Sequence, residues 1–460
     1  MAIMLENIPS IGALGDALYV YVGCVCLILI VSFFPVRHFD FSVFKMKGLT
    51  FSALGGYSFV LVLLFMHFGN SISPVEALFV AAKDIVKTKA DAAMYAKMDA
   101  VAIKQKYYMT SIDSGVSKPE QLPEKPNVIV LFTEGMSAEV IDRYAGREND
   151  LTPNIDSFFD ASLVFDNYYC HTVATYKGLR GQLNSGFVYF NEDLGGNSDS
   201  PAVADDGQKM SSNLISIVDV LNDAGYNTLF VNSEPSNLQF TAYLNSFGCD
   251  TVTSGAISGR LLTDKEAFGL LETVSEQLTQ PFFAGFYNIG THHGFESPDE
   301  KYREGTNAIL NKFFNYDAQF GSFWNYFQNS KLADNTILVF TADHSTFDSP
   351  EYKAALNSDQ NYFINTIPLM IYYRGVTHEI IDAKGRNSLG LTPTLLDILD
   401  LEVHDNYFLG TSLFTDRETP FEKMSEVVTS YYYTGDGGVT AAKDDGIIES
   451  IREYYAISSQ

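Results

Sequence analysis

The sequence is poor in cysteine and in basic residues, and both shortages exclude classes of protein. Its four cysteines are Cys24, Cys26, Cys170 and Cys249, and they form no CxxC pair and no Cys/His ligand spacing. A disulfide framework and a zinc finger are therefore excluded, although a single Cys170–Cys249 bridge stays open. Lysine and arginine number 30 against 56 aspartate and glutamate residues, and the formal net charge of -26 argues against nucleic acid as a partner.

Charged residues are missing from two stretches near the N-terminus. Residues 17–35 and 49–68 are almost entirely apolar, and each has about the length that crosses a bilayer. A cleaved signal peptide is the alternative for the first stretch, but no basic segment precedes it and a second apolar run follows closely. The connecting loop carries Arg37, Lys45 and Lys47, so the positive-inside rule places it in the cytoplasm. We expect two transmembrane helices within residues 1–73 and an extracytoplasmic C-terminal part.

Residues 74–124 have a different composition, rich in alanine and lysine up to about Thr110. Apolar residues recur there at helical spacing, which predicts an amphipathic juxtamembrane helix. The following stretch, 111–125, contains Asp, Gly, Ser, Pro and Glu and is typical of a linker. The extracytoplasmic domain is therefore expected over residues 125–460.

In this domain strand-like runs alternate with helical patterns. The expected strands are 128–132, 228–231, 282–287, 336–341 and 368–373, and the expected helices are 155–159, 213–224, 264–278, 307–328 and 393–399. Such alternation predicts an α/β fold with a mainly parallel central sheet flanked by helices. The tail beyond about Thr415 is expected to add a few strands and a terminal helix.

Two of the expected strands end at residues that can bind a metal. Glu134 follows the apolar run 128–132, and Asp343 and His344 follow the run 336–341. Ligands collect at the carboxyl ends of strands in open α/β sheets, and oxygen with imidazole donors suits Mn²⁺ or Zn²⁺. A helix-capping or solvated Glu134 and a structural Asp-His pair are the alternatives, but two such strand ends are less easily explained by chance.

A hydroxyl-bearing loop forms a third candidate site. Residues 170–181 read as a loop entering a helix, where Thr172 or Thr175 could simply cap the helix. The functional alternative is a metal-bound threonine alkoxide, supported by the helix dipole, that attacks phosphorus. In that case Lys177 and Arg180 would balance phosphate charge.

The fourth candidate is a histidine pair directly after the strand-like run 282–287. His292 and His293 lie in a loop that also contains glycine, and core packing explains such a place poorly. We therefore expect this loop to contribute to a site.

Taken in order, these pieces resemble the alkaline phosphatase/sulfatase superfamily, most closely its lipoteichoic acid synthase and phosphoglycerol transferase branch. The resemblance covers about residues 125–415 and rests on 127–134, 152–156, 165–167, Thr175 with its downstream glycines, 291–295, 343–344, 393–396 and 409–413. It implies a divalent metal, Mn²⁺ first and Zn²⁺ or Mg²⁺ otherwise, held by Glu134, Thr175, Asp343 and His344. It also implies that Thr175, rather than Thr172, is the nucleophile, and that His292 is a catalytic residue that holds the phosphoryl oxygens or protonates a leaving group. The residues expected to bind the substrate are His292, His293, Lys177 and Arg180.

The departures from this family bear on the substrate. Cys170 is followed by His-Thr-Val-Ala instead of completing the C/S-x-P-x-R motif of sulfatases, so sulfate ester hydrolysis is not expected. The phosphoglycerol branch has a histidine and, shortly beyond it, a tryptophan and an arginine after the strand that matches 228–231. Residues 232–240 contain none of these here. The phosphoethanolamine branch uses extra histidines, for which only His293 is a candidate. The head group is therefore open.

Residues and resemblance together predict a metal-dependent phosphotransferase anchored in a bacterial cytoplasmic membrane, with its catalytic domain outside. It would move a phosphoglycerol-type head group from a phospholipid donor to an envelope glycan or glycolipid through a phosphothreonine intermediate. Phosphoethanolamine transfer is the first alternative. A metal-dependent phosphodiesterase or phosphatase, with water as acceptor, and a non-catalytic glycan-binding ectodomain are the others.

Overall fold

A computed structural model describes residues 118–187 and 215–443 except 297, 402, 404–407 and 428–429, together with residues 446 and 450. All of these lie in one compact unit, residues 90–460. The two expected membrane helices and the amphipathic helix fall outside the described residues, as does the end of the tail. Within the described part of the chain, no helix combines the length and the apolar composition of a bilayer span.

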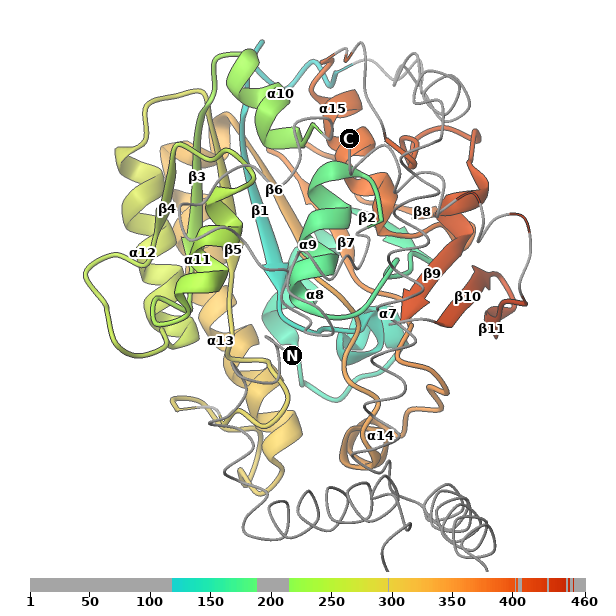
Figure 1. Ribbon diagram of the computed structural model, residues 1–460. Helices are drawn as coiled ribbons and strands as arrows, with labels where there is room; N and C mark the ends of the chain where they lie inside the picture. The colour runs from blue at the N-terminus through green and yellow to red at the C-terminus, as the bar shows by residue number, and fades with distance from the viewer. Residues whose placement is uncertain are drawn as a thin grey trace, which may run out of the picture. The chain divides into compact units, whose positions relative to one another are not determined.

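The unit is built around an eight-stranded sheet (Figure 1). In spatial order its strands are β4 (Thr251–Thr253), β3 (Asn227–Asn232), β5 (Phe282–Tyr287), β1 (Asn127–Thr133), β6 (Thr336–Ala342), β7 (Leu369–Tyr372), β2 (Leu163–Asp166) and β8 (Glu379–Asp382). Neighbouring strands are parallel, except that β7 runs antiparallel to both β6 and β2. The mainly parallel sheet expected from the sequence is confirmed.

Strand β1 lies in the middle of the sheet, and all seven of its residues are buried. Helices cover both of its faces, which is why it reads as a continuous apolar run rather than as an alternating one. Its parallel neighbours β5 and β6 bring their carboxyl ends to the same edge, with Phe132 opposite Tyr287 and Thr341. Residues that directly follow β1, β5 and β6 therefore meet at one place.

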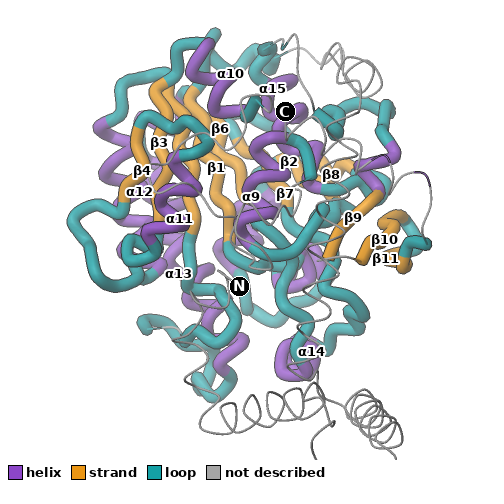
Figure 2. The backbone as a smooth tube through the Cα atoms, in the orientation of Figure 1, coloured by secondary structure: helices purple, strands orange, loops and turns teal. Residues whose placement is uncertain are grey.

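The helices form two layers, one on each face of the sheet (Figures 1 and 2). One layer contains α8 (Pro153–Asp160), α12 (Asp264–Gln277) and α13 (Ala308–Asn329); the other contains α9 (Thr175–Asn184), α10 (Ile217–Asp223), α11 (Leu238–Asn245) and α15 (Leu391–Ile398). Aromatic rings fill the first layer: Phe158 of α8 meets Phe320 and Trp324 of α13 edge to face, with ring centroids 5.5 and 4.9 Å apart.

Shorter elements complete the unit. They are α7 (Asp142–Ala145), α14 (Pro350–Leu356) and the 3₁₀ turns η3 (Ala138–Val140), η5 (Lys331–Asp334), η6 (Ser388–Gly390) and η7 (Pro420–Lys423). The tail forms the expected strands, an antiparallel sheet of β9 (Met424–Val427), β10 (Ser430–Gly435) and β11 (Gly438–Ala441). This small sheet matters for the site because β9 supplies a partner to helix α9.

Candidate metal centre and active site

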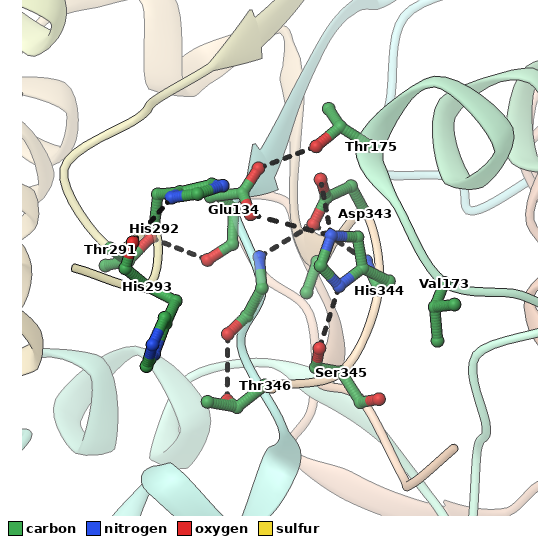
Figure 3. Close-up of polar contacts among 12 residues, drawn as sticks. Glu134, Val173, Thr175, Thr291, His292, His293, Asp343, His344, Ser345 and Thr346 are labelled. Carbon is green, nitrogen blue, oxygen red and sulfur yellow. Dashed lines mark hydrogen bonds and ion pairs between the residues drawn. The ribbon is translucent and has the colours of Figure 1, made fainter. Parts of the chain in front are cut away.

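Three ligand atoms converge at the carboxyl edge of the sheet. Glu134 follows β1, Asp343 and His344 follow β6, and one ligand atom from each lies within 4.8 Å of the others. Figure 3 shows the three side chains pointing toward one another. Nε2 of His344 is 3.5 Å from Oε1 of Glu134 and 3.6 Å from Oδ2 of Asp343. All three residues are buried.

The two residues from β6 are held with their free ligand atoms facing inward. Oδ1 of Asp343 accepts hydrogen bonds from the backbone N–H of Gly135 (2.8 Å) and of His344 (2.7 Å), while Oδ2 is buried and has no hydrogen-bond partner among the described residues. Nδ1 of His344 donates to the carbonyl of Ser345 at 2.8 Å. Because Nδ1 carries the proton, Nε2 of the neutral ring presents a lone pair.

Glu134 is fixed by the loop after β5. Its N–H donates to Oδ1 of Asn288 at 3.1 Å, and its carbonyl accepts from the hydroxyl of Thr291 at 2.6 Å. Asn288 is held in turn by a buried carboxylate at the start of α12, since its amide donates to Oδ1 of Asp264 at 3.1 Å. On the side chain, Oε2 of Glu134 accepts from the hydroxyl of Tyr287 at 2.8 Å.

Thr175 reaches the same carboxylate from the opposite layer. It is the first residue of α9, and its hydroxyl donates to Oε2 of Glu134 at 2.8 Å. Ala174, directly before it, has φ of 72° and ψ of 135°, a conformation that a residue with a Cβ adopts only when its surroundings impose it. This turn places a hydroxyl at the positive end of the helix dipole and beside the ligand cluster.

The pKa values of the three ligands reflect how closely their charges lie together. Burial alone would raise the pKa of Glu134, but the hydrogen bond and charge of His344 lower it well below its usual value. Burial and repulsion from Glu134 raise the pKa of Asp343. Burial would lower the pKa of His344, but the charges of Asp343 and Glu134 raise it. Bound protons therefore reduce the repulsion between the carboxylates of Glu134 and Asp343.

The donor set fits a divalent metal. The buried Oδ2 of Asp343 needs a partner, and one carboxylate oxygen of Glu134 and Nε2 of His344 lie within reach of the same point. Carboxylate and imidazole donors suit Mn²⁺ or Zn²⁺, and the hydroxyl of Thr175 adds a fourth oxygen. Glu134, Asp343, His344 and Thr175 are thus brought together as the sequence predicted; which ion binds is not fixed by these donors.

The two histidines of the β5 loop play different parts. His292 lies close enough to Glu134 for its charge to contribute to lowering the pKa of that carboxyl, after the larger contribution of His344. Its Nδ1 donates to the carbonyl of His293 at 2.8 Å, which leaves Nε2 free for a substrate. His293 turns away and contacts the ring of Phe347, with centroids 5.1 Å apart (Figure 3). The structure brings His292 to the cluster and leaves His293 at its rim.

Lys177 and Arg180 are not brought to the cluster. At 100° per residue along α9 they face away from Thr175. Lys177 forms a buried ion pair with Glu426 of β9 at 3.3 Å, and the Arg180 guanidinium lies 5.0 Å from the ring centroid of Phe247. The other threonine of the loop, Thr172, directs its hydroxyl to the carbonyl of Val173 at 3.4 Å.

Sequence analysis missed several residues that shape the site, namely Tyr287, Asn288, Thr291, Asp264 and Thr346. Each is polar and buried, and each bonds to the cluster or to a residue that holds it; Thr346, for example, donates to the carbonyl of Gly135 at 2.8 Å. A signal existed for Asn288, which directly follows an apolar strand just as Glu134 does. Asp264 gave no such signal because an acidic residue at a helix start is normally a solvated cap.

Helix α9 packs against the backbone of the metal ligands, and Gly178 permits this approach. A Cβ at Gly178 would lie 2.2 Å from the carbonyl oxygen of Asp343. We expect Gly178→Ala to lower the free energy of unfolding by about 1–3 kcal/mol and to displace Thr175. Gly269→Ala is the matched control, because it lies in α12 with no atom within 4 Å of the added Cβ. Urea unfolding of both variants measures this; equal stabilities would contradict the packing described.

Comparisons with known proteins agree with this architecture. A family model described as Sulfatase matches residues 126–401, and no match was found among curated proteins. A solved protein of the alkaline phosphatase superfamily from Vibrio parahaemolyticus has 18% sequence identity and a TM-score of 0.56, covering 79% of this chain and 95% of its own. The lipoteichoic acid synthase LtaP from Listeria monocytogenes has 16% identity and a TM-score of 0.55, covering 79% of this chain and 96% of its own.

A protein of glycosaminoglycan metabolism from Bacteroides thetaiotaomicron is also similar, with 14% identity and a TM-score of 0.51 over 70% of this chain and 87% of its own. Identities this low show a shared fold and leave the substrate undetermined. The family model, however, spans more than half of the 460 residues and includes the cluster of Glu134, Asp343 and His344. This chain belongs to the sulfatase family.

Proposed function

We propose that the protein is a metal-dependent phosphotransferase that takes the head group of a phospholipid onto Thr175 and passes it to an envelope glycan or glycolipid. The observation that carries this proposal is the hydrogen bond from the Thr175 hydroxyl to Glu134 at 2.8 Å, at the first turn of α9. It places a nucleophilic oxygen beside a ligand cluster that requires a cation. Thr175 is partly exposed, which is consistent with access by a substrate.

Glu134, Asp343, His344 and the Thr175 hydroxyl would hold the metal. A bound divalent ion supplies charge that stabilises the phosphodiester oxygens and favours ionisation of a hydroxyl. The protein's own residues hold the Thr175 hydroxyl in place. Glu134 orients the Thr175 hydroxyl through the bond from its proton, so that an oxygen lone pair faces the substrate side. Ala174 and the packing of Gly178 keep this geometry fixed.

The reaction proceeds in two displacements. First, Oγ1 of Thr175 forms a bond to the donor phosphorus and gives up its proton to solvent, while the bond from phosphorus to the diacylglycerol oxygen breaks. His292, whose Nε2 is free, supplies a proton to that leaving oxygen. Second, a hydroxyl of the acceptor forms a bond to the phosphorus of the phosphothreonine diester and passes its proton to His292. The bond from phosphorus to Oγ1 of Thr175 breaks, and Oγ1 takes a proton from solvent.

A threonine at this position also argues against sulfate ester hydrolysis. A formylglycine needs a Cys or Ser precursor, and the nearby Cys170 is buried with its Sγ 3.4 Å from the hydroxyl of Ser345. It lies five residues before the start of α9, whereas the hydroxyl at the ligand cluster belongs to a threonine. The Cys170–Cys249 disulfide that the sequence left open is not formed, because both cysteines have free thiols.

A lipid donor is supported by apolar side chains at the rim. Leu238 at the start of α11 is 77% exposed and Phe347, which contacts the His293 ring, is 44% exposed. Single exposed apolar residues are ordinary on protein surfaces. These two, however, follow the carboxyl ends of β3 and β6, on the edge where the cluster lies. An acyl-bearing substrate would lie against them while its phosphate enters the site.

Hydrolysis, with water as acceptor, is the competing function, and product analysis separates the two. We expect the full chain, given Mn²⁺ and a phospholipid, to release diacylglycerol and to place one head-group phosphate on a glucosyl-diacylglycerol acceptor for each diacylglycerol formed. Diacylglycerol release should fall when the acceptor is left out, after one turnover. Continued release at the same rate, with free head-group phosphate accumulating, would identify a phosphodiesterase instead.

A further inference from the structure

The segment after β3 places a carboxylate on the substrate side of the candidate site. Glu234 lies two residues beyond the end of β3, next to the end of β5, because Asn232 pairs in register with Tyr287. The segment is held in place: the N–H of Glu234 donates to Oδ1 of Asn232 at 2.8 Å, and the hydroxyl of Ser233 donates to the carbonyl of Tyr287 at 2.7 Å. The backbone of this segment is therefore fixed at the sheet edge, and Glu234 is half-buried there.

Glu234 is electrostatically coupled to the cluster. Burial raises the pKa of its carboxyl, repulsion from Glu134 raises it further, and the hydroxyl of Tyr287 and the charge of His292 act in the opposite direction. Tyr287 donates to Oε2 of Glu134, the same oxygen that accepts from Thr175. Glu234 is thus linked to Thr175 through Tyr287 and Glu134.

This half-buried carboxylate lacks a fixed positive partner. Its Oε2 accepts a hydrogen bond from the side-chain amide of Asn237 at 3.3 Å, and no lysine or arginine pairs with it among the described residues. The basic side chains that sequence analysis assigned to the substrate are engaged elsewhere, Lys177 with Glu426 and Arg180 against aromatic rings. A partly desolvated charge without a partner is costly, so a cationic ligand would stabilise it.

A second metal ion fits less well than an organic cation. Among the described residues the groups of three or more potential ligands comprise Glu134, Asp343 and His344, and Glu234 is not a member. An amine carried by the head group could instead neutralise Glu234 as a single charge, without the further ligands that a metal needs. A glycerol head group offers only hydroxyls, which do not neutralise the carboxylate.

We propose that Glu234 is the recognition group for a cationic amine, so that the transferred head group is a phospho-amino-alcohol of the ethanolamine type. This inference rests on the proposed phosphotransferase function and specifies its donor. It departs from the phosphoglycerol donor that the family resemblance implied. The departure agrees with the absence of the histidine, tryptophan and arginine expected after β3.

A competition between two donors tests the inference. The full chain is given Mn²⁺, an acceptor and equal amounts of phosphatidylethanolamine and phosphatidylglycerol, each with different acyl chains so that mass spectrometry assigns every diacylglycerol to its donor. We expect wild type to consume phosphatidylethanolamine at least about tenfold faster, and Glu234→Gln to lower that ratio at least about tenfold. Glu276→Gln, which removes a carboxylate that accepts from Tyr326 at the far end of α12, should keep the wild-type ratio.

The outcomes are distinct. Preference for phosphatidylglycerol by the wild type, or a ratio that Glu234→Gln leaves unchanged, overturns the inference while Thr175-dependent release still supports phosphotransfer. Loss of one bound metal ion per chain in Glu234→Gln identifies a metal ligand and also overturns it. If neither donor yields Thr175-dependent diacylglycerol, the proposed function itself fails. The wild-type preference alone decides the question if the variant does not fold.

Discussion

Replacing Thr175 by alanine is expected to lower head-group transfer by at least about a thousandfold, because the variant lacks the oxygen that forms the covalent intermediate. The location of the Thr175 hydroxyl, in addition to its chemistry, supports this expectation. Of the two threonines in this loop, Thr175 is the one whose hydroxyl donates to Glu134, at 2.8 Å, and it stands at the first turn of α9 after the strained Ala174. Thr175→Ser keeps the hydroxyl and should retain measurable transfer. Diacylglycerol release from phospholipid micelles is the assay.

Thr172→Ala is the matched control for this experiment. Both threonines precede or begin α9, and sequence spacing alone left the choice between them open. The Thr172 hydroxyl faces the carbonyl of Val173 and not the cluster, so its removal should change the rate by less than about threefold. Loss of transfer in Thr172→Ala with activity retained in Thr175→Ala would reverse the assignment of the nucleophile.

Replacing Asp343 by asparagine is expected to abolish metal binding and to lower transfer at least about a hundredfold. Asparagine keeps the shape and can still accept from the N–H of Gly135, but it removes the negative charge from the buried Oδ2 position. Metal content per chain and titration with Mn²⁺ and Zn²⁺ measure the effect. Asp348→Asn, five residues away and paired with the partly exposed Lys353, should bind metal as the wild type does.

The same cluster predicts how metal affinity depends on pH. Burial and the charge of Glu134 raise the pKa of Asp343 to about 8. Burial would lower the pKa of His344, but the charges of Asp343 and Glu134 raise it to about 10, so below pH 8 the ligands hold protons that a metal must displace. Apparent affinity should therefore rise with pH between pH 6 and 8, about tenfold per unit for each proton released. Affinity that is independent of pH in this range, or full metal content in Asp343→Asn, would contradict this account of the cluster.

Much of the sheet could be predicted because its central strands are buried on both faces. In β1, β5 and β6 every residue is buried, so the sequence shows uninterrupted apolar runs whose ends mark where Glu134, Asp343 and the histidine loop lie. The edge strands β4 and β8 were not predicted, because they are three and four residues long and largely exposed. Helix α10 begins at Ile217 rather than at residue 213, since Ser216 and Asp219 form a capping box.

Side-chain partners from distant parts of the chain could not be predicted. Lys177 looked free to bind phosphate, but its partner Glu426 lies 249 residues further on, in a strand whose packing against α9 no local pattern indicates. The same holds for Tyr287, whose hydroxyl reaches Glu134 from a neighbouring strand. Periodicity reveals which residues are buried, whereas pairing of polar groups depends on tertiary contacts.

The central claim is that Thr175 carries the transferred group, and the intact mass of the protein tests it most directly. The full chain should be incubated with Mn²⁺ and both phospholipids in the absence of acceptor, quenched in acid and weighed beside Thr175→Ala. We predict a single adduct on the wild type, with the mass of phosphoethanolamine, that maps to Thr175 and is missing from the variant. An adduct of equal yield on Thr175→Ala, or diacylglycerol release by the wild type with no adduct at any time, would contradict the account.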